Sequence, residues 1–198
     1  SNLAQLKEAV LKAKADVGIC FDGDADRCVV VDEKGQTVGC DHLTGWLATI
    51  FLKDHPKSAI VFDLRSSKAV AEMIREAGGK PFKCRVGHVF MKEAMAKHNA
   101  IFGGELSGHF YFKKNFFADS GAMAFASVLS GLADAKKPMS ELIKPARRYV
   151  QSGEINFETE DKEAALDDLK RAYPKAKIDE LDAVTVDACS WWGNVRFE

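Results

Sequence analysis

The sequence has no pair of cysteines at C-x-x-C spacing, no long apolar run and no excess of one charge. Its five cysteines stand singly, which argues against a zinc site, and we interpret them as reduced thiols of a cytoplasmic protein. No apolar run reaches the roughly 18 residues of a membrane span, and the first residues lack a signal-peptide pattern, so we expect no membrane partner. The formal net charge of -1 argues against nucleic acid as the main partner, because its backbone needs a concentrated basic face.

The composition is that of a globular protein, with 46% hydrophobic and 29% charged residues. Between about residues 40 and 135, strand-like and helix-like segments alternate, which predicts an α/β fold with a parallel or mixed sheet covered by helices. We expect strands at 17–21, 28–31, 58–62, 81–86 and 100–102, and helices at 43–52, 66–77, 89–97 and from about 120 to 132. Asp41 is a candidate cap for the helix at 43–52, and Asp119 or Ser120 for the last helix.

The pattern changes after about residue 149. Residues 150–157 read as a strand, residues 161–173 read as a helix, and short strand-like segments follow. This succession predicts a smaller α+β unit at the end of the chain.

The sharpest local feature is the acidic loop at residues 21–27, F-D-G-D-A-D-R, between two apolar runs of strand length. Three carboxylates this close repel one another unless a cation lies among them. The small residues between them let the oxygens of Asp22, Asp24 and Asp26 converge. Hard oxygen ligands suit Mg²⁺, and Arg27 adds a planar fork of donors for a phosphate beside the metal. The alternative interpretation is a solvated acidic turn.

A calcium-binding EF-hand loop is a second alternative for the same segment. The three aspartates match its first three ligands, and Glu33 falls at its twelfth position. Its sixth position needs Gly for a sharp turn, however, and Arg27 stands there. A strand-like run also follows the loop, where an EF-hand requires a helix.

A phosphatase of the haloacid-dehalogenase type is a third alternative, in which an apolar strand leads into D-x-D. Asp22 would then be the nucleophile and Asp24 the acid/base. That family usually has Thr or Val two residues after the second Asp, where this sequence has Asp26. Its downstream acidic pair has no credible counterpart, because Asp167 and Asp168 lie in the late predicted helix and read as a solvated face.

A glycine-rich loop at residues 103–109, G-G-E-L-S-G-H, is the second feature. Alternate spacing in an extended loop would put Glu105, Ser107 and His109 on one side, where a carboxylate and a hydroxyl can hold neighbouring sugar hydroxyls. The glycines let the backbone approach a ligand. A polar turn with a capping serine is the alternative interpretation of this segment alone.

Together, the acidic loop and the later glycine-rich loop resemble the motifs of the α-D-phosphohexomutase family, which includes phosphomannomutase and phosphoglucomutase. The runs D-L-R-S-S at 63–67, V-G-H at 86–88 and F-F-A-D-S-G at 116–121 continue the resemblance. It covers nearly the whole chain, and the motifs occur in the expected order.

The resemblance implies a four-domain enzyme of which this chain is one part. Residues 1–36 would be the end of domain two with the metal loop, and residues 37–148 a complete mixed-sheet α/β domain three with the sugar loop. Residues 149–198 would begin an α+β domain four of the TATA-box-binding-protein-like type. The phosphoserine of domain one and the phosphate-clamping loop of domain four would be missing, so we expect the chain alone to be inactive as a mutase.

The resemblance also implies a mechanism and roles for single residues. Mg²⁺, held by Asp22, Asp24 and Asp26, would bridge to the phosphoserine, and a phosphoryl group would pass to glucose or mannose 1- or 6-phosphate through a bisphosphate that turns around in the cleft. The other implied site residues are Arg27, Arg65 and His88 as catalytic residues and Glu105, Ser107 and His109 as substrate-binding residues.

Several alternatives stay open at this stage. Arg65 suits either a substrate phosphate or proton handling, and His88 suits substrate contact or acid/base chemistry. For His88 and His109, capping or packing is the structural alternative. A non-catalytic module that binds sugar phosphates would have the same motifs. The sequence does not separate mannose from glucose preference, nor does it determine the oligomeric state.

Overall fold

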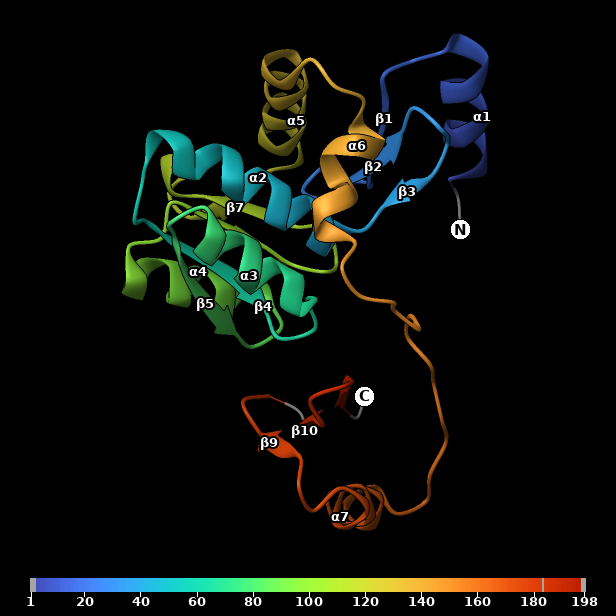
Figure 1. Ribbon diagram of the computed structural model, residues 1–198, viewed down its shortest axis with the longest axis vertical. Helices are drawn as coiled ribbons and strands as arrows, with labels where there is room; N and C mark the ends of the chain where they lie inside the picture. Colours follow the sequence, from blue (N-terminus) through green and yellow to red (C-terminus); the bar gives the residue numbers. More distant parts are fainter. Residues whose placement is uncertain (1–2, 183, 197–198) are drawn as a thin grey trace. The chain divides into compact units, whose positions relative to one another are not determined.

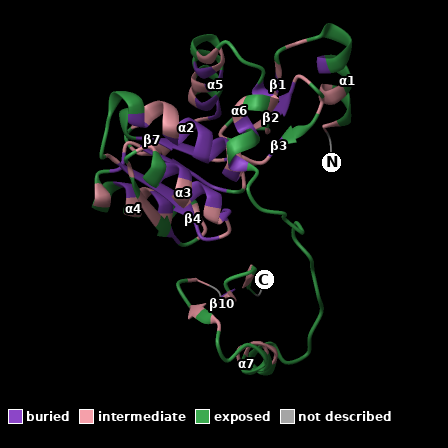
Figure 2. Ribbon diagram, viewed as in Figure 1, coloured by how far each residue is buried: buried purple, intermediate pink, exposed green. Residues whose placement is uncertain are grey.

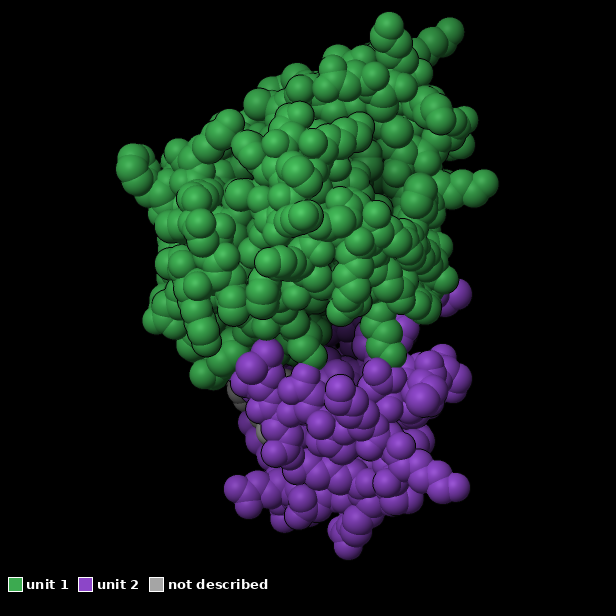
Figure 3. Space-filling view, turned by 60° about the vertical axis from the view of Figure 1, so that its left-hand side comes forward, with its two compact units in different colours: residues 1–149 green, residues 150–198 purple. Residues whose placement is uncertain are grey.

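The computed structural model describes residues 3–182 and 184–196 (Figure 1). The chain divides into two compact units, Ser1–Tyr149 and Val150–Glu198 (Figure 3). The predicted segments 1–36 and 37–148 both fall in the first unit, and the domain boundary between them stays a prediction. None of the described helices combines the length and hydrophobicity that crossing a membrane requires.

The first unit contains two sheets and most of the helices. Its helices are α1 (Ala4–Ala13), α2 (Cys40–Asp54), α3 (Lys68–Glu76), α4 (His88–His98), α5 (Gly121–Ala135) and α6 (Met139–Ile143), with 3-10 turns η1 (Lys113–Asn115) and η2 (Lys144–Ala146). Its strands are β1 (Val17–Phe21), β2 (Cys28–Asp32), β3 (Thr37–Val38), β4 (Ala59–Asp63), β5 (Lys80–Cys84), β6 (Phe102–Gly104), β7 (Phe110–Phe112) and β8 (Ala118–Asp119).

The smaller sheet of this unit presents the acidic loop. It is antiparallel with the order β1-β2-β3. Phe21 at the end of β1 pairs with Cys28 at the start of β2, so the acidic loop closes the hairpin between them. Cys28 and Val30 of β2 are buried in the core, which anchors the base of the loop.

The larger sheet is mixed, as the alternating pattern predicts. Its strand order is β5-β4-β6-β7-β8. β4 pairs in parallel with both β5 and β6, whereas β7 is antiparallel to β6 and to β8. Because β4, β5 and β6 run in the same direction, their carboxyl ends lie at one edge of the sheet.

Helices cover both faces of this sheet. Successive residues of a strand point to opposite faces. Ile60 and Phe62 of β4 therefore join a core with α2 and α3, while Val61 between them packs with Met91 and Met95 of α4. Figure 2 shows the buried residues gathered where α2 and α3 lie over the sheet. The result is the α/β/α layering that the predicted fold class requires.

Of the caps predicted for α5 and α2, the first is confirmed and the second is wrong. Ser120 Oγ accepts a hydrogen bond from Met123 N over 3.2 Å, so Ser120 is the cap of α5 among the two candidates. The prediction that Asp41 caps α2 is wrong, because the helix begins earlier and its N-cap is Gly39. The buried Asp41 carboxylate instead accepts from Ser67 N over 3.1 Å at the start of α3.

The second unit is a small α+β arrangement. It contains α7 (Lys162–Ala172) and an antiparallel sheet of order β11-β10-β9, formed by β9 (Lys177–Asp179), β10 (Val184–Asp187) and β11 (Trp192–Val195). Asp161 Oδ1 accepts from Ala164 N over 2.9 Å and caps α7, which confirms the helix predicted there. The likeness of this unit to a TATA-box-binding-protein-like domain stays a prediction.

The strand predicted at residues 150–157 is wrong. These residues are exposed throughout and belong to no strand (Figure 2). A strand needs a neighbour for its backbone hydrogen bonds, and none of the described strands pairs with this segment. The apolar residues of this segment fit the pattern of a strand, but none of the described strands lies beside it to form hydrogen bonds.

Candidate functional site

Three loops meet at the carboxyl edge of the parallel strands. They follow β4, β5 and β6: the first carries Arg65, the second leads into α4 at His88, and the third carries Glu105. In open α/β sheets, ligands bind at this edge. The fold therefore brings residues from three distant motifs of the sequence to one side of the sheet.

The acidic loop brings its three carboxylates together. Ligand oxygens of Asp22, Asp24 and Asp26 all lie within 4.8 Å of one another. Ala25 has a φ of 59°, in the left-handed region, and its N–H donates to Asp22 O over 3.3 Å. This turn folds the loop back so that its alternate side chains converge.

Asp26 lies among like charges, and its cationic neighbours are Arg27, whose Nε is 3.9 Å from Asp26 Oδ1, and His109. Its Oδ1 atom is buried and accepts no hydrogen bond from the described residues. Burial raises its pKa and the charges of Asp24 and Asp22 add to the rise, while His109 opposes it. A divalent cation among the three carboxylates would compensate their charge more closely than Arg27 does, and an all-oxygen donor set of this kind suits Mg²⁺.

Arg27 closes the loop through Asp22. Arg27 Nε donates to Asp22 Oδ2 over 2.5 Å, and Arg27 N donates to Asp22 Oδ1 over 3.2 Å. The side-chain bond is the largest cause that lowers the pKa of Asp22 and raises that of Arg27, and the backbone bond lowers the pKa of Asp22 further. Both groups therefore stay charged at neutral pH, and the guanidinium is held beside the carboxylate cluster.

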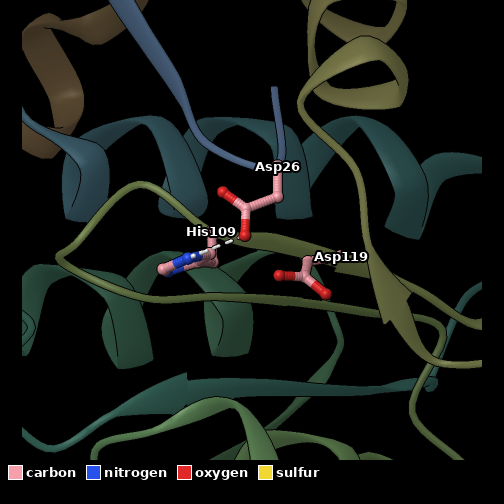
Figure 4. A group of neighbouring side chains, drawn as sticks. All are labelled: Asp26, His109 and Asp119. Carbon is pink, nitrogen blue, oxygen red and sulfur yellow. Dashed lines mark ion pairs between the residues drawn. The ribbon is translucent and has the colours of Figure 1, made fainter. Parts of the chain in front are cut away.

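The acidic loop and the glycine-rich loop are in direct contact. Cys28 N donates to Gly108 O over 3.0 Å, and Arg27 forms a backbone bridge with His109. Figure 4 shows the His109 ring facing Asp26, with His109 Nε2 3.5 Å from Asp26 Oδ2. The two motifs that carried the family resemblance thus form one site.

Asp119 is a further candidate site residue, which the sequence motifs did not predict. Ligand atoms of Asp26, His109 and Asp119 lie within 4.8 Å of one another (Figure 4). Asp119 Oδ1 is also 3.5 Å from Lys92 Nζ. The run F-F-A-D-S-G contains this aspartate, but its place before a helix predicts a cap. The pairing of β7 with β8 and the bond from Gly121 N to Ala25 O bring it to the acidic loop.

Glu105 points into the protein. The residue is 2% exposed, its Oε1 accepts from Gly87 N over 2.9 Å, and its Oε2 accepts from Tyr111 Oη over 2.7 Å. Ser107 Oγ lies 2.9 Å from His109 Nδ1. Glu105 therefore joins the loop after β5 to the glycine-rich loop. Its binding of sugar hydroxyls stays a prediction, and it would have to use the carboxylate lone pairs that these two bonds leave free.

The glycines of this loop are required by close packing. A Cβ on Gly104 would lie 2.1 Å from Thr44 Oγ1 of α2, and Gly108 has a φ of 96°. A side chain at either position would be strained or would push the loop away from α2. These glycines set the path of the loop that presents Ser107 and His109.

Arg65 and His88 are more exposed than Glu105 among the candidate residues at the carboxyl edge of the sheet. Arg65 Nε and Nη2 donate to Asp63 Oδ2 over 3.1 and 2.8 Å, and its side chain is partly exposed. His88 is the exposed first residue of α4, next to Gly87, whose N–H binds Glu105. The roles of both residues in catalysis stay predictions.

Comparison with known proteins decides the family. Residues 40–149 match the family model described as phosphoglucomutase/phosphomannomutase, alpha/beta/alpha domain III, and residues 1–35 match the one described as domain II of the same proteins. The chain belongs to the phosphoglucomutase/phosphomannomutase family. The EF-hand and haloacid-dehalogenase alternatives are thereby set aside, and β2 directly after the acidic loop leaves no room for an EF-hand helix.

Relatives of this family span the whole chain. It is 39% identical over 194 residues to a phosphomannomutase of Methanocaldococcus jannaschii, which covers 98% of this chain and 43% of that protein. A solved phosphoglucomutase/phosphomannomutase family protein of Burkholderia thailandensis superposes with a TM-score of 0.87 at 28% identity, covering 100% of this chain and 43% of that one.

A more distant structure shares the fold alone. Aspergillus fumigatus N-acetylphosphoglucosamine mutase, solved with GlcNAc-6P and magnesium, gives a TM-score of 0.55 at 15% identity over 82% of this chain and 44% of that chain. In each of these comparisons the chain spans less than half of the relative's length.

Proposed function

We propose that this chain supplies the metal-binding and hexose-binding part of a phosphomannomutase/phosphoglucomutase. The parent enzyme would interconvert glucose or mannose 1-phosphate and 6-phosphate through a bisphosphate intermediate and a phosphoserine. The observation that carries the proposal is the contact between the two loops, with His109 Nε2 3.5 Å from Asp26 Oδ2. A phosphoryl group beside the acidic loop and a hexose on the glycine-rich loop would then be neighbours. The cytoplasmic location expected from the sequence is part of this proposal.

The proposed metal is Mg²⁺ on the acidic loop. When bound, it would neutralise charge on the phosphoryl group during transfer. Asp22, Asp24 and Asp26 would hold it, and the buried Asp26 Oδ1, which accepts no hydrogen bond from the described residues, supports this assignment. The magnesium complex of the Aspergillus fumigatus mutase, a protein of the same fold, agrees with the choice of metal.

The remaining residues would bind and orient the substrate. Arg27, held beside the carboxylates by Asp22, would contact the phosphoryl group, since a guanidinium matches phosphate geometry. Arg65 would contact the second phosphate of the hexose. Ser107 and His109 lie partly exposed next to the acidic loop and, with Glu105, would hold sugar hydroxyls. His88 at the start of α4 would face the same ligand.

Isothermal titration tests the metal half of the proposal. We expect the chain to bind Mg²⁺ and Asp24→Asn to weaken that binding by roughly 10- to 100-fold or more, because even outer-shell changes at metal sites have effects of this size. Asp168→Asn, an exposed aspartate of α7, is the matched control and should bind Mg²⁺ as the original chain does. Equal affinity in Asp24→Asn would contradict the assignment.

A second titration tests the sugar half. In the presence of Mg²⁺ we expect glucose 6-phosphate to bind, and Ser107→Ala to weaken the binding. In a coupled assay we expect no mutase turnover by these 198 residues alone. Turnover by the pure chain would contradict the proposal that the phosphate carrier lies in another part of the enzyme.

A further inference from the structure

One buried carboxylate joins two of the loops at the carboxyl edge of the sheet. Asp63 is the last residue of β4 and is fully buried. Its Oδ1 accepts from Ser66 N over 3.1 Å and from Ser66 Oγ over 2.9 Å. Its Oδ2 accepts from Arg65 Nε and Nη2 over 3.1 and 2.8 Å and from Leu106 N over 3.1 Å.

The two carboxylate oxygens of Asp63 accept from different parts of the chain. The bonds from Ser66 to Oδ1 close the turn between β4 and α3, a common local use of an aspartate. The bonds to Oδ2 are not needed for that turn. Leu106 lies 43 residues later in the sequence and stands between Glu105 and Ser107, so its bond fixes the glycine-rich loop against the end of β4.

The contact of Asp63 with Arg65 requires a guanidinium. A buried carboxylate is stable only when donors satisfy it, and Arg65 supplies two of them from one edge of its planar fork. The side chain remains 27% exposed, so Arg65 is held in a defined plane while part of it faces solvent. A lysine would keep the charge but could not form this two-atom contact.

We infer that Asp63 is a positioning residue, which holds Arg65 and the 105–109 loop at a fixed separation so that one hexose phosphate is recognised at both its phosphate and its hydroxyls. The inference rests on the proposed function. Asp63 itself is buried and does not touch the ligand. Its effect is transmitted through the Arg65 guanidinium and the Leu106 N–H.

Asp63→Asn tests the inference against a matched buried aspartate. Asparagine has one acceptor oxygen and no charge, so it cannot satisfy the Ser66 donors together with those of Arg65 and Leu106. We expect glucose 6-phosphate affinity to fall about tenfold, the usual effect of losing one charge-assisted hydrogen bond. Asp41→Asn is the control, because Asp41 is equally buried and binds Ser67 N at the start of the same helix. It should lower the unfolding midpoint without changing the affinity.

A ligand-free measurement accompanies the titrations. Amide hydrogen exchange should accelerate at Leu106 in Asp63→Asn and stay unchanged there in Asp41→Asn. Arg65→Lys covers the case in which Asp63→Asn does not fold, because Arg65 is partly exposed. We expect Arg65→Lys to lose affinity despite its retained charge. In that background, Asp63→Asn should have a smaller further effect than it has alone.

The outcomes separate the inference from the proposed function. If the original chain does not bind glucose 6-phosphate with Mg²⁺, the proposed function fails. If the original chain binds it and Asp63→Asn behaves like Asp41→Asn in affinity and in Leu106 exchange, the positioning role is overturned. Unchanged affinity in Arg65→Lys would overturn it as well.

Discussion

Gly121 lies directly against the backbone of Ala25 in the acidic loop. Gly121 N donates to Ala25 O over 3.2 Å, and a Cβ at position 121 would lie 2.6 Å from that oxygen and 2.8 Å from Arg27 O. Backbone oxygens cannot rotate away as a side chain can. The first residue of α5 therefore supports the proposed metal loop from behind and has no room for a side chain.

Gly121→Ala should displace the acidic loop. We expect a loss of roughly 1–3 kcal/mol in the free energy of unfolding, the usual range for overpacking, together with weaker Mg²⁺ binding. Denaturant unfolding and isothermal titration measure the two effects. Gly23→Ala is the control within the same loop, since a Cβ there meets nothing within 4 Å. Equal effects of the two variants would contradict the role of the Gly121 contact.

Asp26→Asn should stabilise the metal-free protein at neutral pH. The raised pKa of Asp26 means that the folded state binds its proton more tightly than the unfolded state does. The contribution of Asp26 to stability is therefore fully present below the ordinary pKa of an aspartate. It is lost as pH rises through the raised pKa that Asp26 has in the folded protein. Asparagine removes this loss, so we expect a higher unfolding midpoint at pH 7 without metal, and no further rise when Mg²⁺ is added.

Asp22→Asn should have the opposite effect to Asp26→Asn on stability at neutral pH. The bond from Arg27 lowers the pKa of Asp22. The contribution of Asp22 to stability is therefore present above the ordinary pKa of an aspartate and is lost as pH falls through the lowered pKa of the folded protein. We expect Asp22→Asn to lower the unfolding midpoint at pH 7. Thermal unfolding of both variants across pH 3 to 8 compares them, and the same sign of change at pH 7 would contradict this account.

Tyr111→Phe should loosen Glu105 while leaving the packing intact. The hydroxyl is buried and donates to Glu105 Oε2 over 2.7 Å, and burial followed by this bond raises the pKa of Tyr111, so it remains a donor. We expect a loss of about 1–3 kcal/mol in the free energy of unfolding. Glucose 6-phosphate affinity should fall too. Tyr173→Phe, on a half-exposed ring in the second unit, is the control, and an equally small change in both variants would count against a constrained Glu105.

Ser140→Ala should weaken the contact between the β2–β3 turn and α6. Ser140 N and Oγ donate to the Glu33 carboxylate over 3.1 and 2.5 Å. Burial alone would raise the pKa of Glu33, but these bonds outweigh it and the pKa is lowered. Glu33 therefore stabilises the fold above its ordinary pKa and loses this effect as pH falls. We expect a loss of about 1 kcal/mol at pH 7 and a smaller loss at pH 3, measured by urea unfolding.

The control for this prediction is Ser127→Ala. Ser127 Oγ donates to Met123 O within α5 and has no part in the contact with Glu33. Its effect on stability should be the same at both pH values. A pH dependence in Ser127→Ala equal to that of Ser140→Ala would show that the Glu33 contact is not its source.

Local patterns were sufficient for most of the secondary structure. The apolar runs on either side of the acidic loop form β1 and β2, and the alternation from residue 40 onward forms the mixed sheet. The failures have non-local causes. Residues 150–157 have a strand-like composition but no partner strand, and Asp41 looked like a cap for α2 although its carboxylate serves the start of α3.

Local sequence is enough to specify the three aspartates of the acidic loop, the glycine-rich loop and the family that these motifs resemble. The contacts between distant residues become visible in the folded chain: Asp119 and His109 lie beside Asp26, Gly121 lies against Ala25, and Asp63 accepts from Leu106 N. The physical reason is that a motif is built from neighbours in sequence, whereas these contacts depend on strand order and direction. Parallel pairing of β4 with β6 and antiparallel pairing of β7 with β8 bring them together, and no local pattern encodes that pairing.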